Sequence, residues 1–173
     1  IGGQGTGKSI MLEHGLCRIV APYQRISNKR EDFSNRFNNV FASAILYVAE
    51  ESIFAGDPAI MNSIKAYITA DELQIERKGL EAEQMRLFTR FYFLANDEHA
   101  VKLEPDDRRF FVLSTDPSRA RDVKYFTEMR HWLYARGTAH IHHALKTWDP
   151  AAVGMSWGDL ADAPMTATKV KQI

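Results

Sequence analysis

The sequence predicts an α/β fold with a central, mostly parallel sheet flanked by helices. Three observations predict it. A glycine-rich loop at residues 2–9 opens an apolar helix, and an apolar run at residues 44–49 ends in two acidic residues. Further apolar runs alternate with amphipathic segments. The 173 residues, 45% hydrophobic and 25% charged, have the ordinary composition of one globular domain.

The first helix follows the glycine-rich loop directly. Its apolar residues have helical spacing: Ile10, Met11, Leu16, Ile19 and Val20. Pro22 should end this helix, because proline lacks an amide hydrogen and its ring collides with the preceding turn.

Residues 24–39 are polar and show little periodicity, so no element is predicted there. The run from Ala44 to Ala49 indicates a buried strand that ends at Glu50 and Glu51. Asp57 and Pro58 are typical of a helix N-terminus, and the apolar residues that follow have helical spacing: Ile60, Ile64, Tyr67 and Ile68.

Alternating residues predict a strand at Leu73–Arg77, which Lys78 and Gly79 end with a turn. Two more apolar strands are expected at Arg90–Ala95 and Phe110–Leu113. Beyond residue 120, apolar spacing indicates two helices, the first around Tyr125–Leu133 and the second around Ile141–Leu145. Residues 1–150 are expected to form the core, and residues 151–173 a C-terminal tail or the start of a following segment.

Charge and cysteine content limit the classes of function. The 22 basic residues balance the 22 acidic ones, so any contact with DNA must come from a local basic cluster. Cys17 is the only cysteine, and no apolar run reaches the roughly 18 residues that a membrane span needs. A cytoplasmic protein without membrane contact is expected. Because Ile1 precedes the loop directly, we expect the strand that delivers the loop to be truncated.

The loop Gly2-Gly3-Gln4-Gly5-Thr6-Gly7-Lys8-Ser9 matches the pattern G-x-x-x-x-G-K-[ST]. In such a loop, backbone amides at a helix N-terminus surround phosphate oxygens. Lys8 is predicted to neutralise the β- and γ-phosphates of ATP, and Ser9 to place its hydroxyl on Mg²⁺. The sequence therefore predicts a P-loop NTPase.

Two carboxylates follow the buried strand about forty residues after the loop. A P-loop NTPase needs an acid beside the metal and a second group that activates water. Glu50 is predicted to bind Mg²⁺ and Glu51 to activate water, which favours ATP hydrolysis over simple nucleotide binding.

From these residues onward the chain resembles the phage and plasmid primase-helicase family. The ATPase of that family belongs to superfamily 3, with the papillomavirus and parvovirus replicative helicases, and has an AAA+-like core. The segments that carry the resemblance are Glu50-Glu51 with Ala55-Gly56-Asp57, residues 64–69, residues 75–79, Leu94-Ala95-Asn96-Asp97 and residues 107–113. The chain departs from the family at Glu50, where an aspartate is common.

The resemblance implies that Asn96 is the polar sensor, which hydrogen-bonds the attacking water or the γ-phosphate. It also implies that Arg108 or Arg109 reaches the nucleotide of the adjacent subunit as an arginine finger, within a homohexameric ring. The alternative for both arginines is a surface ion pair with Asp106 and Asp107.

Residues 76–79 resemble the hairpin that superfamily 3 rings project into their central channel. Lys78 is the preferred contact to single-stranded or forked DNA, and Lys65 is a weaker candidate. The family also suggests a primase domain upstream of Ile1.

The expected function is therefore an ATP- and Mg²⁺-dependent DNA helicase or translocase in phage or plasmid replication. Two alternatives stay open. One is an ATP-binding initiator or assembly scaffold without translocation. The other is a small-molecule kinase, in which Arg119 and Arg121 would act as lid arginines.

Overall fold

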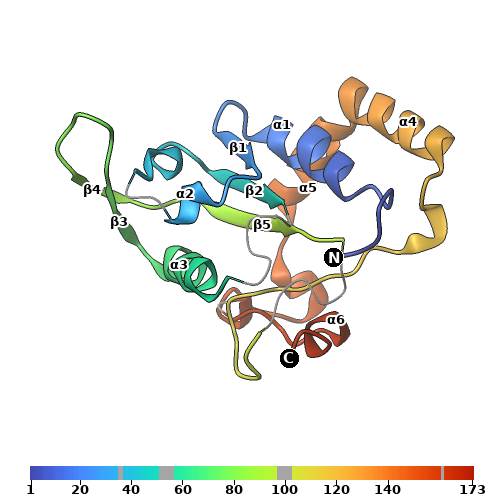
Figure 1. Cartoon of the computed structure of the whole chain (residues 1–173). Coiled ribbons are helices and arrows are strands. Elements are labelled where there is room, and N and C mark those ends of the chain that lie inside the picture. The colour runs from blue at the N-terminus through green and yellow to red at the C-terminus, as the bar shows by residue number, and fades with distance from the viewer. Residues whose placement is uncertain (35–36, 51–56, 97–102, 161) are drawn as a thin grey trace. The chain divides into compact units, whose positions relative to one another are not determined.

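The computed structural model describes residues 1–34, 37–50, 57–96, 103–160 and 162–173 (Figure 1). Glu51, the predicted water activator, lies outside these residues. The chain divides into two compact units, one formed by residues 20–95 and the other by residues 1–19 together with 96–173.

The unit of residues 20–95 contains a three-stranded parallel sheet with the order β1-β2-β5. Its strands are β1 (Gln24–Ser27), β2 (Leu46–Glu50) and β5 (Arg90–Leu94). Residues 46–49 of the central strand β2 are buried, because this strand has a neighbour on each side. The expected α/β fold with a parallel sheet is thus confirmed.

Two short helices, α2 (Glu31–Ser34) and η2 (Asn39–Phe41), and the longer α3 (Pro58–Thr69) complete this core. The Asp57 carboxylate accepts hydrogen bonds from the amides of Ala59 at 2.9 Å and Ile60 at 3.4 Å, so α3 begins where the Asp-Pro pair predicted. Aromatic rings from the strands and helices contact one another in the core: Phe33, Phe41, Tyr47, Tyr67 and Phe91.

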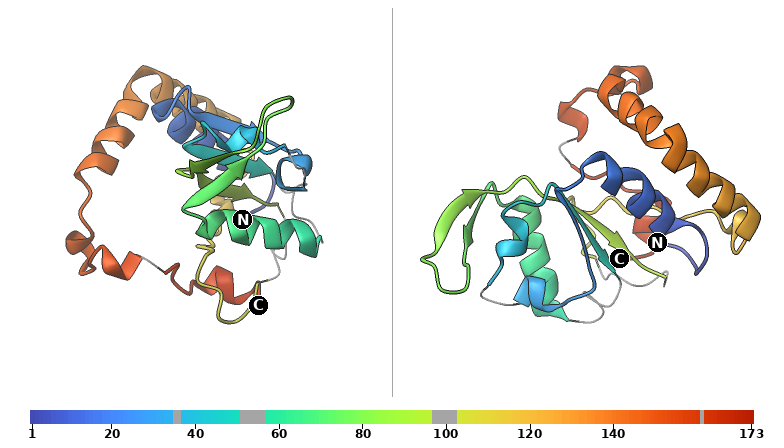
Figure 2. Two further views of the ribbon diagram at one scale, coloured as in Figure 1. Left: turned by 90° about the vertical axis from the view of Figure 1, so that its left-hand side faces the viewer. Right: turned by 90° about the horizontal axis from the view of Figure 1, so that it is seen from above.

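Strands β3 (Glu72–Ile75) and β4 (Glu83–Arg86) form an antiparallel hairpin that extends away from the sheet (Figures 1 and 2). The Asn38 side chain holds the base of this hairpin: its amide donates to the Gln74 carbonyl and its oxygen accepts from the Glu76 amide, both at 2.9 Å. The turn predicted at Lys78 and Gly79 is confirmed, and the predicted strand is present but ends at Ile75 rather than Arg77.

The other unit contains the first helix, which runs from Lys8 to Ile19 and comprises η1 (Ile10–Leu16) and α1 (Cys17–Ile19). It packs against the helical run α4 (Val123–Trp132), η5 (Leu133–Gly137) and α5 (Thr138–Thr147). Two separate helices were expected beyond residue 120, but the run is uninterrupted. The π-helical η5 joins α4 to α5, and its residues Leu133 and Gly137 are buried.

Residues 150–173 contain η6 (Pro150–Val153), η7 (Gly158–Leu160) and α6 (Ala167–Val170), and η4 (Pro117–Arg119) precedes α4. Lys169 of α6 is fully buried and contacts Asp107 of the same unit. The predicted boundary at residue 150 stays a prediction. Within the described part of the chain, none of the helices has the length and apolar character that crossing a membrane requires.

Further sequence expectations differ from the structure. Strand β1 and helix α2 lie in the segment without a predicted element, and β4 was not predicted. Among the described residues, β1 pairs with β2. Residues 110–113 form no strand. A strand needs a continuous ladder of hydrogen bonds. Among the described residues, this segment pairs with Ile1, whose amine donates to the Leu113 carbonyl and whose carbonyl accepts from the Thr115 amide.

Candidate nucleotide-binding site

The glycine-rich loop lies at the start of the first helix, as its pattern predicts. Gly5 and Gly7 have φ angles of +79° and +85°, a region that side chains with a Cβ rarely adopt. The helix begins at Lys8, so the amides of the loop lie at a helix N-terminus.

Lys8 and Asn96 lie together in the structure, although 88 residues separate them in the sequence. The Lys8 ammonium donates to the Asn96 side-chain oxygen at 3.2 Å. It also donates to the carbonyls of Gly2 and Gly3, the latter at 2.9 Å. The Lys8 ammonium thus contacts carbonyls of its own loop and the side chain of Asn96, which comes after β5 in the sequence.

The predicted Mg²⁺ ligands, Ser9 and Glu50, belong to different units of the chain. Ser9 is exposed, and its side chain makes no capping hydrogen bond to the helix. Glu50 is exposed at the carboxyl end of β2, in register with Leu94 of β5. Among the described residues, no three His, Cys, Asp or Glu side chains form a candidate metal cluster.

The two arginines proposed as the finger differ in their surroundings. The Arg109 guanidinium is 3.4 Å from the Asp107 carboxylate, and its side chain is 35% exposed. The Arg108 side chain is 74% exposed and, among the described residues, its ion pair is with the exposed Asp162, at 3.8 Å. The expected ion pair with Asp107 is therefore made by Arg109, whereas Arg108 extends into solvent.

The predicted DNA contacts belong to the unit of residues 20–95. Lys78 is exposed at the tip of the β3–β4 hairpin, and Gly79 beside it has a φ of +80°, which the tight turn requires. Arg77 is instead paired with Glu83 across the hairpin at 3.3 Å. Lys65 lies on α3 and is half-buried, so of the two lysines Lys78 is the more accessible.

Three residues of a downstream segment contact the glycine-rich loop, and of these the sequence analysis named only Arg121, as a lid arginine of the kinase alternative. The Thr115 hydroxyl donates to the Thr6 hydroxyl at 2.8 Å, the Arg121 amide donates to the Gly5 carbonyl at 3.0 Å, and the Phe126 ring lies against Gly7. They come from a segment more than 100 residues downstream. No local motif marks Thr115 and Phe126, so the sequence carried no signal for their contacts.

A family model matches residues 1–109, which is more than half of the chain. The chain belongs to this family, which is described as a family of unknown function (DUF5906). It is also similar to a curated protein named DNA Primase-polymerase from Nitratiruptor phage NrS-1, with 27% identity over 116 residues. The match covers 65% of this chain and 16% of that protein.

Solved structures of the NrS-1 C-terminal region share the fold. One apo structure has a TM-score of 0.73 and 20% sequence identity, and covers 99% of this chain and 40% of that chain. The A form apo structure has a TM-score of 0.71 at 19% identity, with 99% and 40% coverage. This chain therefore spans well under half of the solved region and about a sixth of the curated relative.

Proposed function

We propose that this chain is the ATP-hydrolysing motor of a phage or plasmid replication protein, with the P-loop NTPase fold of superfamily 3 helicases. The hydrogen bond between Lys8 and Asn96 carries the proposal. It brings the lysine of the glycine-rich loop to the polar residue after β5, the pair that a phosphate-binding cation and a sensor of the attacking water would form.

In this proposal the amides of residues 2–9 bind the phosphate chain of ATP, and Lys8 exchanges its contacts with the Gly2 and Gly3 carbonyls for phosphate oxygens. Asn96 orients the water that attacks the γ-phosphate. Glu51 accepts the proton of that water.

Ser9 and Glu50 suit a bound Mg²⁺, because both offer the oxygen ligands that this ion prefers and the Ser9 hydroxyl is not used as a helix cap. When bound, Mg²⁺ neutralises charge on the β- and γ-phosphates. The longer side chain at Glu50, in place of the common aspartate, keeps the same carboxylate.

Arg108 is the better candidate for the finger that completes the site of a neighbouring subunit. Its side chain is 74% exposed, and a pair at 3.8 Å to an exposed carboxylate contributes little, so it can be exchanged readily for a phosphate. Arg109 is held by Asp107 and supports the backbone of this segment instead.

The context of DNA replication is supported by the similarity to a protein named DNA Primase-polymerase. A primase needs a single-stranded template, and a motor on the same protein would provide one. We propose that Lys78 at the hairpin tip contacts the DNA strand within a homohexameric ring.

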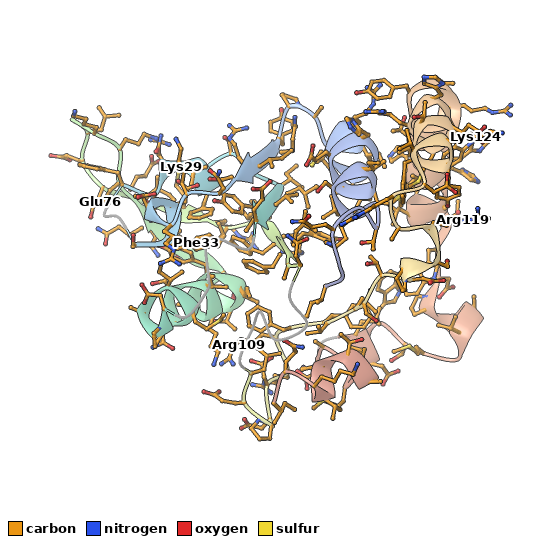
Figure 3. The ribbon with its side chains drawn as sticks, turned by 45° about the vertical axis from the view of Figure 1, so that its right-hand side comes forward. Lys29, Phe33, Glu76, Arg109, Arg119 and Lys124 are labelled. Carbon is orange, nitrogen blue, oxygen red and sulfur yellow. The ribbon has the colours of Figure 1, made fainter. Side chains whose placement is uncertain are left out.

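The experiment is a measurement of ATP turnover with and without single-stranded DNA. Lys8→Ala should reduce turnover by roughly a hundredfold or more, because a charge that stabilises the transferring phosphoryl group is lost. Lys124→Ala, at an exposed position on α4, is the matched control and should keep turnover (Figure 3).

DNA-stimulated turnover that depends on Lys8 would support the motor. ATP binding without turnover would instead indicate the initiator or scaffold function. Transfer of phosphate to a small molecule, with no turnover in its absence, would indicate the kinase.

A further inference from the structure

The segment between Thr115 and Phe126 crosses the glycine-rich loop at three points. Thr115 contacts Thr6, Arg121 contacts Gly5, and Phe126 contacts Gly7. A Cβ on Gly5 would lie 2.9 Å from the Arg121 Cγ, and one on Gly7 would lie 2.3 Å from the Phe126 ring. The absence of side chains at these glycines therefore permits the close approach.

Arg121 is fixed against the loop by its backbone. Its amide donates to the Gly5 carbonyl at 3.0 Å, and its φ of +64° is unusual for a residue with a Cβ. Such a conformation is unfavourable for a residue with a Cβ and persists where surrounding contacts impose it. The arginine side chain thus starts from a defined position beside the loop.

The guanidinium of Arg121 is available for a ligand. The residue is exposed, and within the part of the chain that the structure describes its guanidinium makes no hydrogen bond or ion pair. The guanidinium carbon is three bonds beyond the Cγ that borders Gly5, so the charged group can reach the space over the loop. It carries five N–H donors in a planar arrangement that suits phosphate oxygens.

The neighbouring Arg119 has a different role, which makes it a natural comparison (Figure 3). Its guanidinium is 3.3 Å from the Asp122 carboxylate and lies 5.3 Å from the centre of the Tyr125 ring. The hydrogen bond from the Tyr125 amide holds the pKa of Asp122 below its usual value, so this carboxylate stays ionised near neutral pH. Arg119 is therefore engaged in holding the start of α4.

We propose that Arg121 binds the phosphate chain of the nucleotide held by its own subunit, as a second cation beside Lys8. This inference rests on the proposed function. A nucleoside triphosphate brings several negative charges to the loop, whereas residues 1–9 supply one lysine side chain. A guanidinium anchored at Gly5 adds bidentate hydrogen bonds to that site.

The test is the affinity for a fluorescent ATP analogue, for its ADP counterpart and for adenosine. Arg121→Ala should weaken ATP binding by at least about tenfold, the loss expected for a charge-assisted hydrogen bond, and leave adenosine binding unchanged. Arg121→Lys should restore part of the affinity, because it keeps the charge and loses the planar donors. Arg119→Ala is the matched control and should change ATP affinity by less than about twofold.

Equal ATP affinity in Arg121→Ala and the parent protein would overturn the inference. Equal losses for ATP and adenosine would also overturn it, because they would indicate a structural role. The failure of the proposed function is distinguishable: it would appear as no ATP binding by the parent protein, or as binding that Lys8→Ala leaves intact. Thermal unfolding of each variant identifies any loss of fold.

Discussion

A buried carboxylate determines how the two candidate finger residues are presented. Asp107 accepts hydrogen bonds from the amides of Arg109 at 2.9 Å and Phe110 at 3.0 Å. The fully buried Lys169 donates to the Asp107 carbonyl at 2.5 Å and lies 3.7 Å from its carboxylate. The backbone is thereby held on both sides of Arg108, whose side chain remains in solvent.

The first prediction concerns Lys169. Lys169→Ala should lower the free energy of unfolding by about 3 kcal/mol, because the Asp107 carboxylate loses its fully buried cationic partner and keeps only the partly exposed Arg109 beside it. Lys146→Ala, at an exposed position on α5, is the control and should cost less than about 0.5 kcal/mol. Urea denaturation measures both values, and equal losses would contradict this role for the buried pair.

The second prediction concerns pH. Burial, with a hydrogen bond of 2.6 Å to the Asp32 carboxylate, raises the pKa of Tyr47 above its usual value near 10. The folded protein therefore keeps this proton at a pH where the unfolded chain releases it. The resulting stabilisation is complete below about pH 10 and decreases as the pH rises further.

Tyr47→Phe should remove this part of the alkaline loss of stability, and at neutral pH it should cost about 1 kcal/mol for the lost hydrogen bond. Urea denaturation between neutral pH and about pH 11 measures the slope of stability against pH. A slope as steep in Tyr47→Phe as in the parent protein would show that other groups cause it.

At the residue scale, the sequence identified groups that belong to motifs and missed those that do not. Lys8 was predicted from the pattern of its loop and Asn96 from the family resemblance, and their contact followed from the fold. The contact between Lys169 and Asp107 joins residues 62 apart with no shared pattern. Arg108 and Arg109 are adjacent and chemically identical, so only their surroundings distinguish them.

At the scale of elements, the strength of the local signal decided what could be predicted. Helix α3 has a capping aspartate, a first-turn proline and helical apolar spacing, and the structure confirms it. Strand β1 has four largely polar residues and forms because β2 offers a hydrogen-bonding edge. The interruption expected between α4 and α5 is absent, because the π-helical turn of η5 allows the helix to continue.

The third prediction concerns the β3–β4 hairpin. If Lys78 contacts a DNA phosphate, Lys78→Ala should weaken binding of single-stranded DNA and reduce the slope of log affinity against log salt by about 0.7. Basal ATP turnover should not change, because the hairpin tip carries none of the nucleotide-binding residues. Fluorescence anisotropy at several salt concentrations measures the slope.

Lys29 provides the control for this experiment. It is an exposed lysine of the same unit, outside the hairpin (Figure 3). Lys29→Ala has the same change of charge, so a general effect of net charge would appear in both variants. Equal slopes for Lys78→Ala and the parent protein would exclude the hairpin tip as a phosphate contact.

At the scale of the whole molecule, the parallel sheet was predictable because its central strand is a continuous apolar run with a recognisable end. The contacts of residues 115–126 with the glycine-rich loop could not be predicted, because they depend on where a helix distant in the sequence packs. In a ring, the nucleotide site would also depend on assembly, since the arginine finger and the glycine-rich loop would come from different copies of the chain.

The last prediction tests that arrangement directly. Lys8→Ala and Arg108→Ala should each abolish ATP turnover, the first by removing the phosphate-binding cation and the second by removing the finger. In an equal mixture with exchanging subunits, about one quarter of the interfaces combine an intact Lys8 with an intact Arg108 from the neighbouring copy, because each occurs with a probability of one half. Turnover should return to about that fraction of the parent rate. Mixing Lys8→Ala with a variant that carries both changes is the control, and it should restore nothing. A mixture of the single variants that stays inactive would mean that both residues act in the same subunit, and the shared site of a ring would then have to be abandoned.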